Sequence, residues 1–353
     1  MSLAARIAAR IRSGGPMSVA EYMHLCLHDP REGYYAARPA LGPEGDFITA
    51  PQVSQVFGEL IGLWMVEVWR QMGSPAPVRL VELGPGDGTL MSDLLRAAGR
   101  TAGFADAAEV WLVEPSRPLR DLQRQRLGPV PRQVEGLDEV PGGAPLLLVA
   151  NEVLDCLPTH QWEWRDGGWM ERRIGLGAEG LVFGLAPAPP LVAAPQVAPE
   201  GAVFEHSPAQ EALASDIAAR IARDGGAALL VDYGRAEPGL GDTLQAVKGH
   251  AKAHPLETPG EADLTVHADF PSVLAAARRE GIETAGPQGQ GRFLRSLGLE
   301  ARAGALAIAR PDEAPRIQRQ VERLAAPDQM GELFLAVALH SPGLQPPGFG
   351  GPP

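Results

Sequence analysis

The sequence has few cysteines, and their positions exclude two kinds of protein. Only Cys26 and Cys156 are present, and they belong to no paired spacing. This argues against a disulfide framework and against a zinc cluster, and it indicates a reducing compartment. We therefore expect a cytoplasmic protein without a metal site.

The chain also has little positive charge. Its 31 lysine and arginine residues are outnumbered by 43 aspartate and glutamate residues, which gives a formal net charge of −12. Proteins that bind a nucleic-acid backbone carry a basic surface that neutralises phosphates. We therefore expect no nucleic-acid partner.

Long hydrophobic runs are missing too. No apolar stretch approaches the roughly 18 residues of a membrane span, and the run Leu60–Val68 is interrupted by Glu67. We therefore expect no membrane span. Glycine (42 residues) and proline (34) together make up about one residue in five of the 353. This share is below the roughly 25–30% that is typical of low-complexity chains. A folded, loop-rich protein is expected.

The N-terminal region predicts helices. Leu3, Ile7 and Ile11 recur every four residues, which indicates an amphipathic helix that ends at Gly14. The arginine-rich start could also resemble an organelle transit peptide, but an ordinary helix explains it more simply. A second short helix is expected over Val19–Leu27.

A further helix start is predicted at Thr49. Thr49 stands as N-cap with Gln52 three residues later, and Ile48 and Val53 are placed to form a hydrophobic staple. Apolar residues then continue at helical spacing, which predicts one helix that ends near Gly73.

From position 78 onward, short apolar runs alternate with helix-like segments. The expected strands are Val78–Leu83, Val110–Val113, Leu146–Ala150, Ala227–Val231 and, last, Leu333–Leu339. The expected helices are Leu90–Ala98, Leu119–Arg126, Pro208–Arg223, Pro271–Glu280 and Ala314–Leu324. Such alternation is typical of a doubly wound α/β sheet. The stretch 239–265 is expected to be loop-like.

The alternation breaks after Pro158. Residues 160–174 alternate around Asp166, Gly167 and Gly168 as a β-hairpin would, 181–185 add a strand, and 187–201 form a proline-spaced loop. We therefore predict a helical cover over 1–75, a cofactor-binding half of the core over 76–158, a β-rich insertion over 159–201, a second half over 202–342 and a flexible tail over 343–353.

The strongest signal is the run VRLVELGPGDGTL at 78–90, which reads as a strand, a glycine turn and a helix start. Glycines let the backbone turn sharply and let a ligand lie against bare main chain. The dinucleotide fingerprint requires Gly-x-Gly-x-x-Gly, whereas Thr89 stands where its last glycine would be. A nicotinamide-dependent oxidoreductase is therefore the weaker interpretation.

The residues around this loop point to another adenosine cofactor. The Glu-x-Gly-x-Gly-x-Gly pattern that begins at Glu82 resembles motif I of class I S-adenosylmethionine-dependent methyltransferases. Glu114 follows the next expected strand, where a carboxylate can accept hydrogen bonds from both ribose hydroxyls of an adenosine. The alternative interpretation is that Glu114 is a solvated acid at the end of a strand. Asn151 and Glu152 follow a later strand, so they should point into the ligand crevice.

Further motifs narrow the resemblance: Gly45–Pro51, Asn151–Pro158, Asp232–Gly234, Asp263–Phe270 and Gln290–Leu294. Together with the glycine loop they are similar to the MidA family of protein arginine methyltransferases, which includes the mitochondrial assembly factor of respiratory complex I. The resemblance runs from about Met17 to Leu339. Two departures are Cys156, where alanine is expected, and Asp87, where a basic residue is common.

The resemblance implies an α/β, seven-stranded class I methyltransferase core that uses S-adenosyl-L-methionine. It implies methylation of an arginine in the large, quinone-site subunit of complex I. The cofactor-binding candidates are Glu82, Gly84, Pro85, Gly86, Gly88, Glu114 and Asn151. The substrate-side candidates are Phe47, Thr49, Pro51 and His267, although Thr49 also fits as a helix cap and His267 as a structural histidine.

The chemistry of methyl transfer suggests the catalytic residues. An in-line displacement needs the nucleophile about 3–3.5 Å from the methyl carbon. Because the guanidinium group of arginine stays protonated, a carboxylate must grip it and localise its charge. Glu152 is the first candidate, supported by Asp155 or Asp46. Asp155 could instead cap a helix.

Other interpretations remain. A non-catalytic assembly chaperone could keep the same fold and bind its client. A metal site at His250 and His254 is disfavoured because Ala251 stands where a zinc protease has glutamate. The hairpin tryptophans are expected to pack, with partner binding as the alternative. A homodimer is possible, and the sequence does not decide the oligomeric state.

Overall fold

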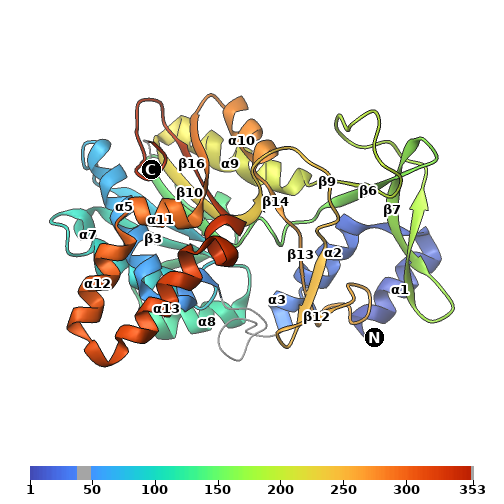
Figure 1. Ribbon diagram of the computed structural model, residues 1–353, viewed down its shortest axis with the longest axis horizontal. Helices are drawn as coiled ribbons and strands as arrows, with labels where there is room; N and C mark the ends of the chain where they lie inside the picture. The colour runs from blue at the N-terminus through green and yellow to red at the C-terminus, as the bar shows by residue number, and fades with distance from the viewer. Residues whose placement is uncertain (38–48, 351–353) are drawn as a thin grey trace.

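The computed structural model describes residues 1–37 and 49–350. Figure 1 shows a large sheet flanked by helices on the left, and the N-terminal helices with two smaller sheets on the right. The N-terminus lies in the right-hand part. No helix in the described ranges is long and apolar enough to cross a membrane.

The large sheet has the strand order β4-β3-β2-β5-β10-β16-β15. Its strands are β2 (Val78–Leu83), β3 (Ala108–Val113), β4 (Arg132–Val134), β5 (Leu146–Asn151), β10 (Gly226–Arg235), β15 (Glu283–Gly289) and β16 (Phe334–His340). Only β16 runs antiparallel to its neighbours, and the short β14 (Ala268–Asp269) pairs parallel with the end of β10. The predicted seven-stranded class I core is confirmed.

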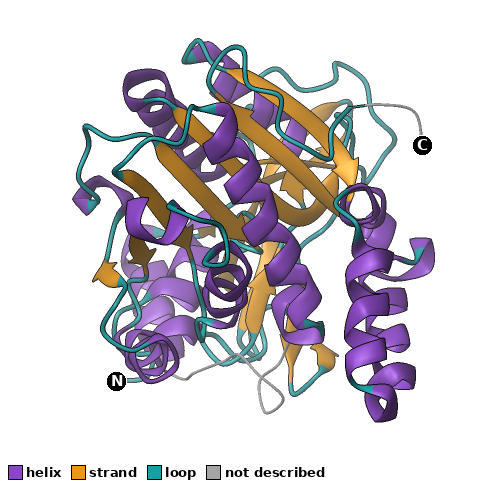
Figure 2. Cartoon of the chain, turned by 90° about the vertical axis from the view of Figure 1, so that its left-hand side faces the viewer, coloured by secondary structure: helices purple, strands orange, loops and turns teal. Residues whose placement is uncertain are grey.

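Helices cover both faces of this sheet (Figure 2). The buried strands have apolar residues on both faces, so both faces need a cover. Leu80, Leu147 and Leu229 face one hydrophobic core, and the next residue of each strand faces the other. One face packs against α5 (Gln55–Gln71), α6 (Thr89–Ala98), α11 (Gln290–Ser296), α12 (Leu299–Ala309) and α13 (Ala314–Ala325). The other packs against α9 (Pro208–Asp224) and α10 (Phe270–Arg279); α7 (Phe104–Ala107) and α8 (Arg117–Leu127) complete the core.

The helix predicted from Thr49 to Gly73 is broken in two, which corrects the sequence prediction. α4 (Ala50–Val53) ends at Ser54, whose extended backbone (φ −156°, ψ 136°) separates it from α5. The Ser54 hydroxyl accepts a hydrogen bond from the Val56 N–H at 3.3 Å and so caps α5. Ile48, the expected staple partner, lies outside the described residues.

The N-terminal cover consists of α1 (Leu3–Gly14), α2 (Val19–His28) and α3 (Tyr34–Ala37). Its first two helices form as predicted, and Leu3, Ile7 and Ile11 are all buried. They pack with Tyr22 and Leu264 in a third hydrophobic core, separate from the two that flank the large sheet.

The insertion forms the predicted hairpin within a second sheet. This second sheet contains β1 (Met17–Ser18), β6 (His160–Arg165), β7 (Gly168–Leu176), β8 (Leu181–Ala186) and β9 (Val203–His206). Trp162 is fully buried and Trp164 contacts Trp169 edge to face, as the packing interpretation expected. The expected loop at 239–265 is wrong in part, because it contains the three-stranded sheet of β11 (Gln245–Lys248), β12 (Ala251–Ala253) and β13 (Asp263–Thr265).

Candidate active site

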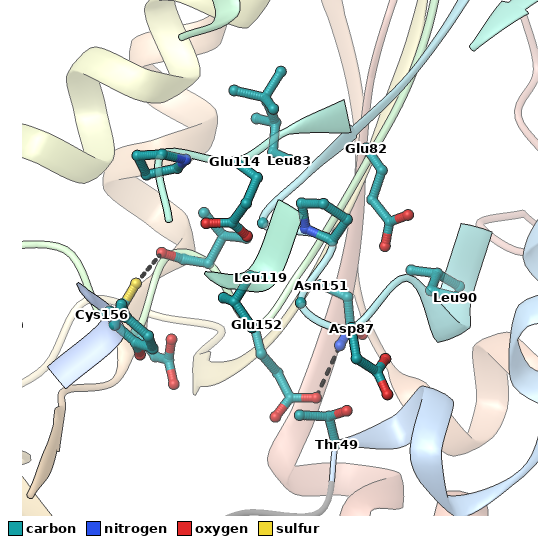
Figure 3. A pocket seen from close by; sticks show the side chains of 18 of the residues that line it. Thr49, Glu82, Leu83, Asp87, Leu90, Glu114, Leu119, Asn151, Glu152 and Cys156 are labelled. Atoms are coloured by element: carbon teal, nitrogen blue, oxygen red, sulfur yellow. Dashed lines mark hydrogen bonds between the residues drawn. The ribbon is translucent and has the colours of Figure 1, made fainter. Parts of the chain in front are cut away.

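A cavity of about 390 Å³ lies at the carboxyl ends of the central strands (Figure 3). The chain runs from β2 outward to β4 and then returns to β5 on the other side of β2. Ligands of open α/β sheets bind where the strand order reverses in this way. Residues of α2, α3, α4 and β13 close the cavity from the side of the cover.

The glycine loop after β2 forms one wall. Gly84, Gly86 and Gly88 have φ values of 60°, 54° and 82°, which is the left-handed region where glycine is favoured. The buried Gln123 side chain donates to the Gly86 carbonyl at 2.8 Å and supports the loop from α8. Asp87 stands where a basic residue is common in the family. Its carboxylate pairs with Arg126 at 2.8 Å and accepts a hydrogen bond from the Thr89 N–H at 3.0 Å.

Two buried carboxylates flank this loop. Burial, with smaller contributions from Asp87 and Glu114, raises the pKa of Glu82 to about 8. One oxygen of Glu82 is buried without a partner in the described part of the chain. Glu114 accepts the Ser116 N–H at 2.8 Å, and burial raises its pKa to about 7. Both groups are therefore placed to accept hydrogen bonds from a ligand.

The loop after β5 holds the predicted catalytic residue. Glu152 has φ 54°, which is uncommon for a residue with a side chain. Its Oε1 accepts hydrogen bonds from the Asn151 side chain at 2.8 Å and from the Ala50 N–H of α4 at 3.2 Å. Burial, and next the charge of Asp155, raise the pKa of Glu152 to about 7. In Figure 3 its carboxylate points toward Thr49.

Asp155 stands beside Glu152 on the same loop. Burial raises its pKa to about 6, although a hydrogen bond from the Tyr233 side chain opposes the shift. Asp232 holds this loop in place, because its Oδ2 accepts the N–H groups of Leu154 at 2.8 Å and Asp155 at 3.2 Å. Its Oδ1 accepts the Tyr233 N–H at 2.9 Å. Asp155 therefore lines the cavity and is not a helix cap.

The cover supplies residues that the sequence did not identify. The Tyr35 hydroxyl donates to Asp263 at 3.1 Å, and both residues line the cavity. His28 also lines it, with its Nε2 3.3 Å from the Cys156 carbonyl. Asp263 and Tyr233 lie in the family-like motifs, which was a signal for them. His28 and Tyr35 had no local signal.

Most predicted site residues meet at this cavity. The lining includes Thr49, Pro51, Glu82, Gly84, Pro85, Gly86, Glu114, Asn151, Glu152 and Asp155. Gly88 instead precedes α6 as its N-cap. His267 stands behind the lining, with its ring edge-on to Tyr233 at 5.6 Å. Asp46 and Phe47 lie outside the described residues.

The ionisable side chains that line the cavity are mostly acidic. Its acidic lining residues are Glu82, Asp87, Glu114, Glu135, Glu152, Asp155 and Asp263. No lysine or arginine occurs among the described residues of the lining. A low-dielectric cavity with this lining favours cationic ligands.

Known proteins resemble this chain over nearly its full length. A family model described as S-adenosyl-L-methionine-dependent methyltransferase matches residues 60–288. The mitochondrial protein arginine methyltransferase NDUFAF7 homolog of Drosophila melanogaster is 39% identical, and the match covers 96% of this chain and 84% of that protein. Human protein arginine methyltransferase NDUFAF7 is 34% identical, with 94% and 81% covered.

A solved structure agrees with the fold. A crystal structure from Burkholderia thailandensis, bound to S-adenosyl-homocysteine, has 28% identity and a TM-score of 0.84. The alignment covers 99% of this chain and 92% of that one. The fold, the glycine loop and these relatives define a class I S-adenosylmethionine-dependent methyltransferase. Within this class, the chain belongs to the MidA-like family.

The cavity residues fit this cofactor. S-adenosylmethionine carries two cationic groups, a sulfonium and an ammonium, and the acidic lining suits both. Among the described residues, one buried oxygen of Glu82 and one of Asn151 have no hydrogen-bond partner, so a bound ligand can donate to them. Glu114, which follows the last residue of β3, would accept the ribose hydroxyls of the bound cofactor. A Cβ at Gly84 would lie 2.9 Å from the Val153 side chain, so both the space and the left-handed backbone at this position favour glycine.

Proposed function

We propose that this enzyme transfers a methyl group from S-adenosylmethionine to an arginine of a protein substrate. The observation that carries the proposal is the pair of neighbouring carboxylates, half-buried Glu152 and buried Asp155, in a cavity whose described lining contains no lysine or arginine. A guanidinium is a planar cation whose donors match a carboxylate fork. The two relatives above that are named protein arginine methyltransferases support the same substrate class.

Glu152 would grip the guanidinium and hold its charge on the nitrogens that do not react. Asn151 and the Ala50 N–H fix the position of the Glu152 Oε1, so the carboxylate is oriented before a substrate arrives. Asp155 lies close enough to raise the pKa of Glu152 and would share the positive charge. The bound cofactor supplies an electrophilic methyl group on its sulfonium.

We further propose that the target arginine lies in the large, quinone-site subunit of respiratory complex I. This finer statement rests on the MidA-like motifs, and the relationship to proteins named NDUFAF7 supports it. The net charge of −12 favours a substrate segment that is basic around the arginine.

The test is the variant Glu152→Gln, which keeps the shape of the side chain and removes its charge. We expect S-adenosyl-homocysteine binding within about twofold of wild type and turnover lowered at least about 100-fold. Turnover is measured with labelled S-adenosylmethionine and the recombinant quinone-site subunit, and the product is located by peptide mass spectrometry.

The control is Glu280→Gln, an exposed carboxylate at the end of α10, which should keep full activity. Methylarginine in the wild-type product supports the proposal. A stable complex with the subunit that contains no methylarginine would instead support the chaperone interpretation. Full turnover by Glu152→Gln would remove this residue from the mechanism.

A further inference from the structure

An exposed apolar patch lies on the insertion, away from the cavity. Its large side chains are 37–81% exposed and come from the end of β7, from β8 and from the following loop: Leu176, Val182, Phe183, Leu185, Leu191, Val192 and Val197. Exposed apolar side chains that gather on one segment of a soluble protein mark a candidate site of interaction. We call this set the β8 patch.

β8 lies at an edge of its sheet. It pairs with β7, from Glu171 opposite Ala186 to Leu176 opposite Leu181, and with no other strand of the described chain. Natural edge strands are usually protected by charges, prolines or a covering element. β8 has neither charge nor proline, and its central residues are exposed.

The loop after β8 presents part of the same patch. The Trp169 Nε1–H donates to the Pro195 carbonyl at 2.8 Å, which fixes this loop against β7. Leu191 is 60% exposed and Val197 is 81% exposed. These side chains are therefore held outward by a fixed loop.

The charge distribution indicates what covers the patch. Residues 180–199 contain no charged side chain, although the whole chain carries a net charge of −12. Two copies of a strongly acidic protein repel one another over most of their surfaces and can approach at an uncharged patch. An edge strand is also self-complementary, because a two-fold axis places it antiparallel to its own copy.

We propose that the β8 patch is the interface of a homodimer. β8 pairs antiparallel with β8 of a second copy about a two-fold axis near Gly184, so that one sheet continues through both protomers. The apolar side chains of the patch pack around this pairing. The inference is independent of the identity of the methyl acceptor.

The first experiment measures mass in solution by sedimentation velocity. Wild-type protein at micromolar concentration is expected to sediment as a dimer, and the double variant Val182→Asp/Leu185→Asp as a monomer. Ile308→Asp is the matched control, because Ile308 is 83% exposed on α12, outside the patch. Circular dichroism and S-adenosyl-homocysteine binding check that each variant is folded. A monomeric wild type, or a double variant that still forms dimers, would overturn the proposal.

The second experiment tests the geometry by disulfide trapping. Gly184→Cys is expected to form a covalent dimer under mild oxidation because the axis brings the two positions together. Gly304→Cys is the control, since both glycines are exposed and a Cβ at either position meets no atom within 4 Å. Equal cross-linking of the two variants would exclude the proposed register.

Discussion

At the scale of single residues, the site keeps carboxylates where water cannot reach them. Glu82 is only 2% exposed, and one of its oxygens has no partner among the described residues. A buried acceptor without a donor costs folding free energy, and a ligand that supplies the donor recovers it. We therefore expect Glu82 to lower the free energy of unfolding of the apo enzyme and to contribute to cofactor binding.

Glu82→Gln tests this cost. Because the folded-state pKa of Glu82 is raised from 4.5 to about 8, the unfolded chain ionises first and wild-type stability falls as pH rises between these values. Glutamine does not ionise. We expect the variant to be more stable than wild type by on the order of 1–3 kcal/mol at pH 8.5, with the difference vanishing near pH 4. Denaturant unfolding of the apo proteins measures it.

The same variant should bind S-adenosyl-homocysteine more weakly, which calorimetry would show. A Glu82→Gln protein that matches the wild-type stability at both pH values would contradict the assigned burial cost.

Sequence reasoning found the site residues that follow a strand, and it found Thr49 and Pro51 through the family motif, but it missed the lining residues of α2 and α3. Glu114 and Glu152 were predictable because the carboxyl ends of parallel strands meet at one edge. His28 and Tyr35 were not, because they lie in a helical cover whose docking onto the sheet has no local pattern. Asp155 was ambiguous until the structure showed its contact with Tyr233.

At the scale of elements, α4 connects the cover to the loop that carries Glu152. The Ala50 N–H at its start donates to Glu152 at 3.2 Å, which favours the ionised carboxylate. α4 exists as a separate turn because Ser54 interrupts the helix that the apolar spacing predicted. Spacing alone could not reveal this break, since buried residues continue on both sides of it.

Ala50→Pro tests this connection. Proline fits the first position of a helix, and Thr49 already has the extended backbone (φ −80°, ψ 160°) that a following proline requires. The variant lacks the N–H, so the pKa of Glu152 should rise. We expect the acid limb of the pH profile of kcat/KM, near pH 7 in the wild type, to move up by about 0.5–1 pH unit.

Ala50→Ser keeps the N–H and serves as the control for that experiment. Profiles that superimpose for a folded Ala50→Pro protein would mean that this hydrogen bond does not tune Glu152.

The strands that were missed share a physical reason. β15 has the sequence ETAGPQG, in which two glycines and a proline replace the apolar run of a buried strand. β11 and β12 are short and lie in a stretch rich in turn residues, where pairing partners decide the structure. The parallel core strands were predictable because both faces are buried and their runs are continuously apolar.

At the scale of the whole molecule, the cavity belongs to both parts of the fold. Its walls come from the glycine loop of the core and from α2, α3 and β13 on the cover side. A ligand held there contacts both parts, so it binds the native chain and not the unfolded one. Ligand binding should therefore stabilise the molecule as a unit.

A thermal unfolding series with S-adenosyl-homocysteine tests this coupling. At 100 times its Kd, the ligand should stabilise the wild type by about 2.7 kcal/mol and raise Tm. Gly86→Val should abolish the shift, because a side chain at this left-handed position would fill the cofactor's space. Since that backbone disfavours valine, Glu114→Gln is the second variant, and it should reduce the shift while folding normally. A wild-type shift in both variants would remove the loop and Glu114 from the site.

The position of β16 has a consequence for synthesis. β16 (Phe334–His340) lies between β10 and β15, although it follows both in the chain. While the ribosome is still making residues before 334, β10 has no neighbour on that side and β15 has no strand to join. The glycine loop can therefore form early in the nascent chain. The large sheet is complete only after β16 has left the exit tunnel and paired with β10 and β15.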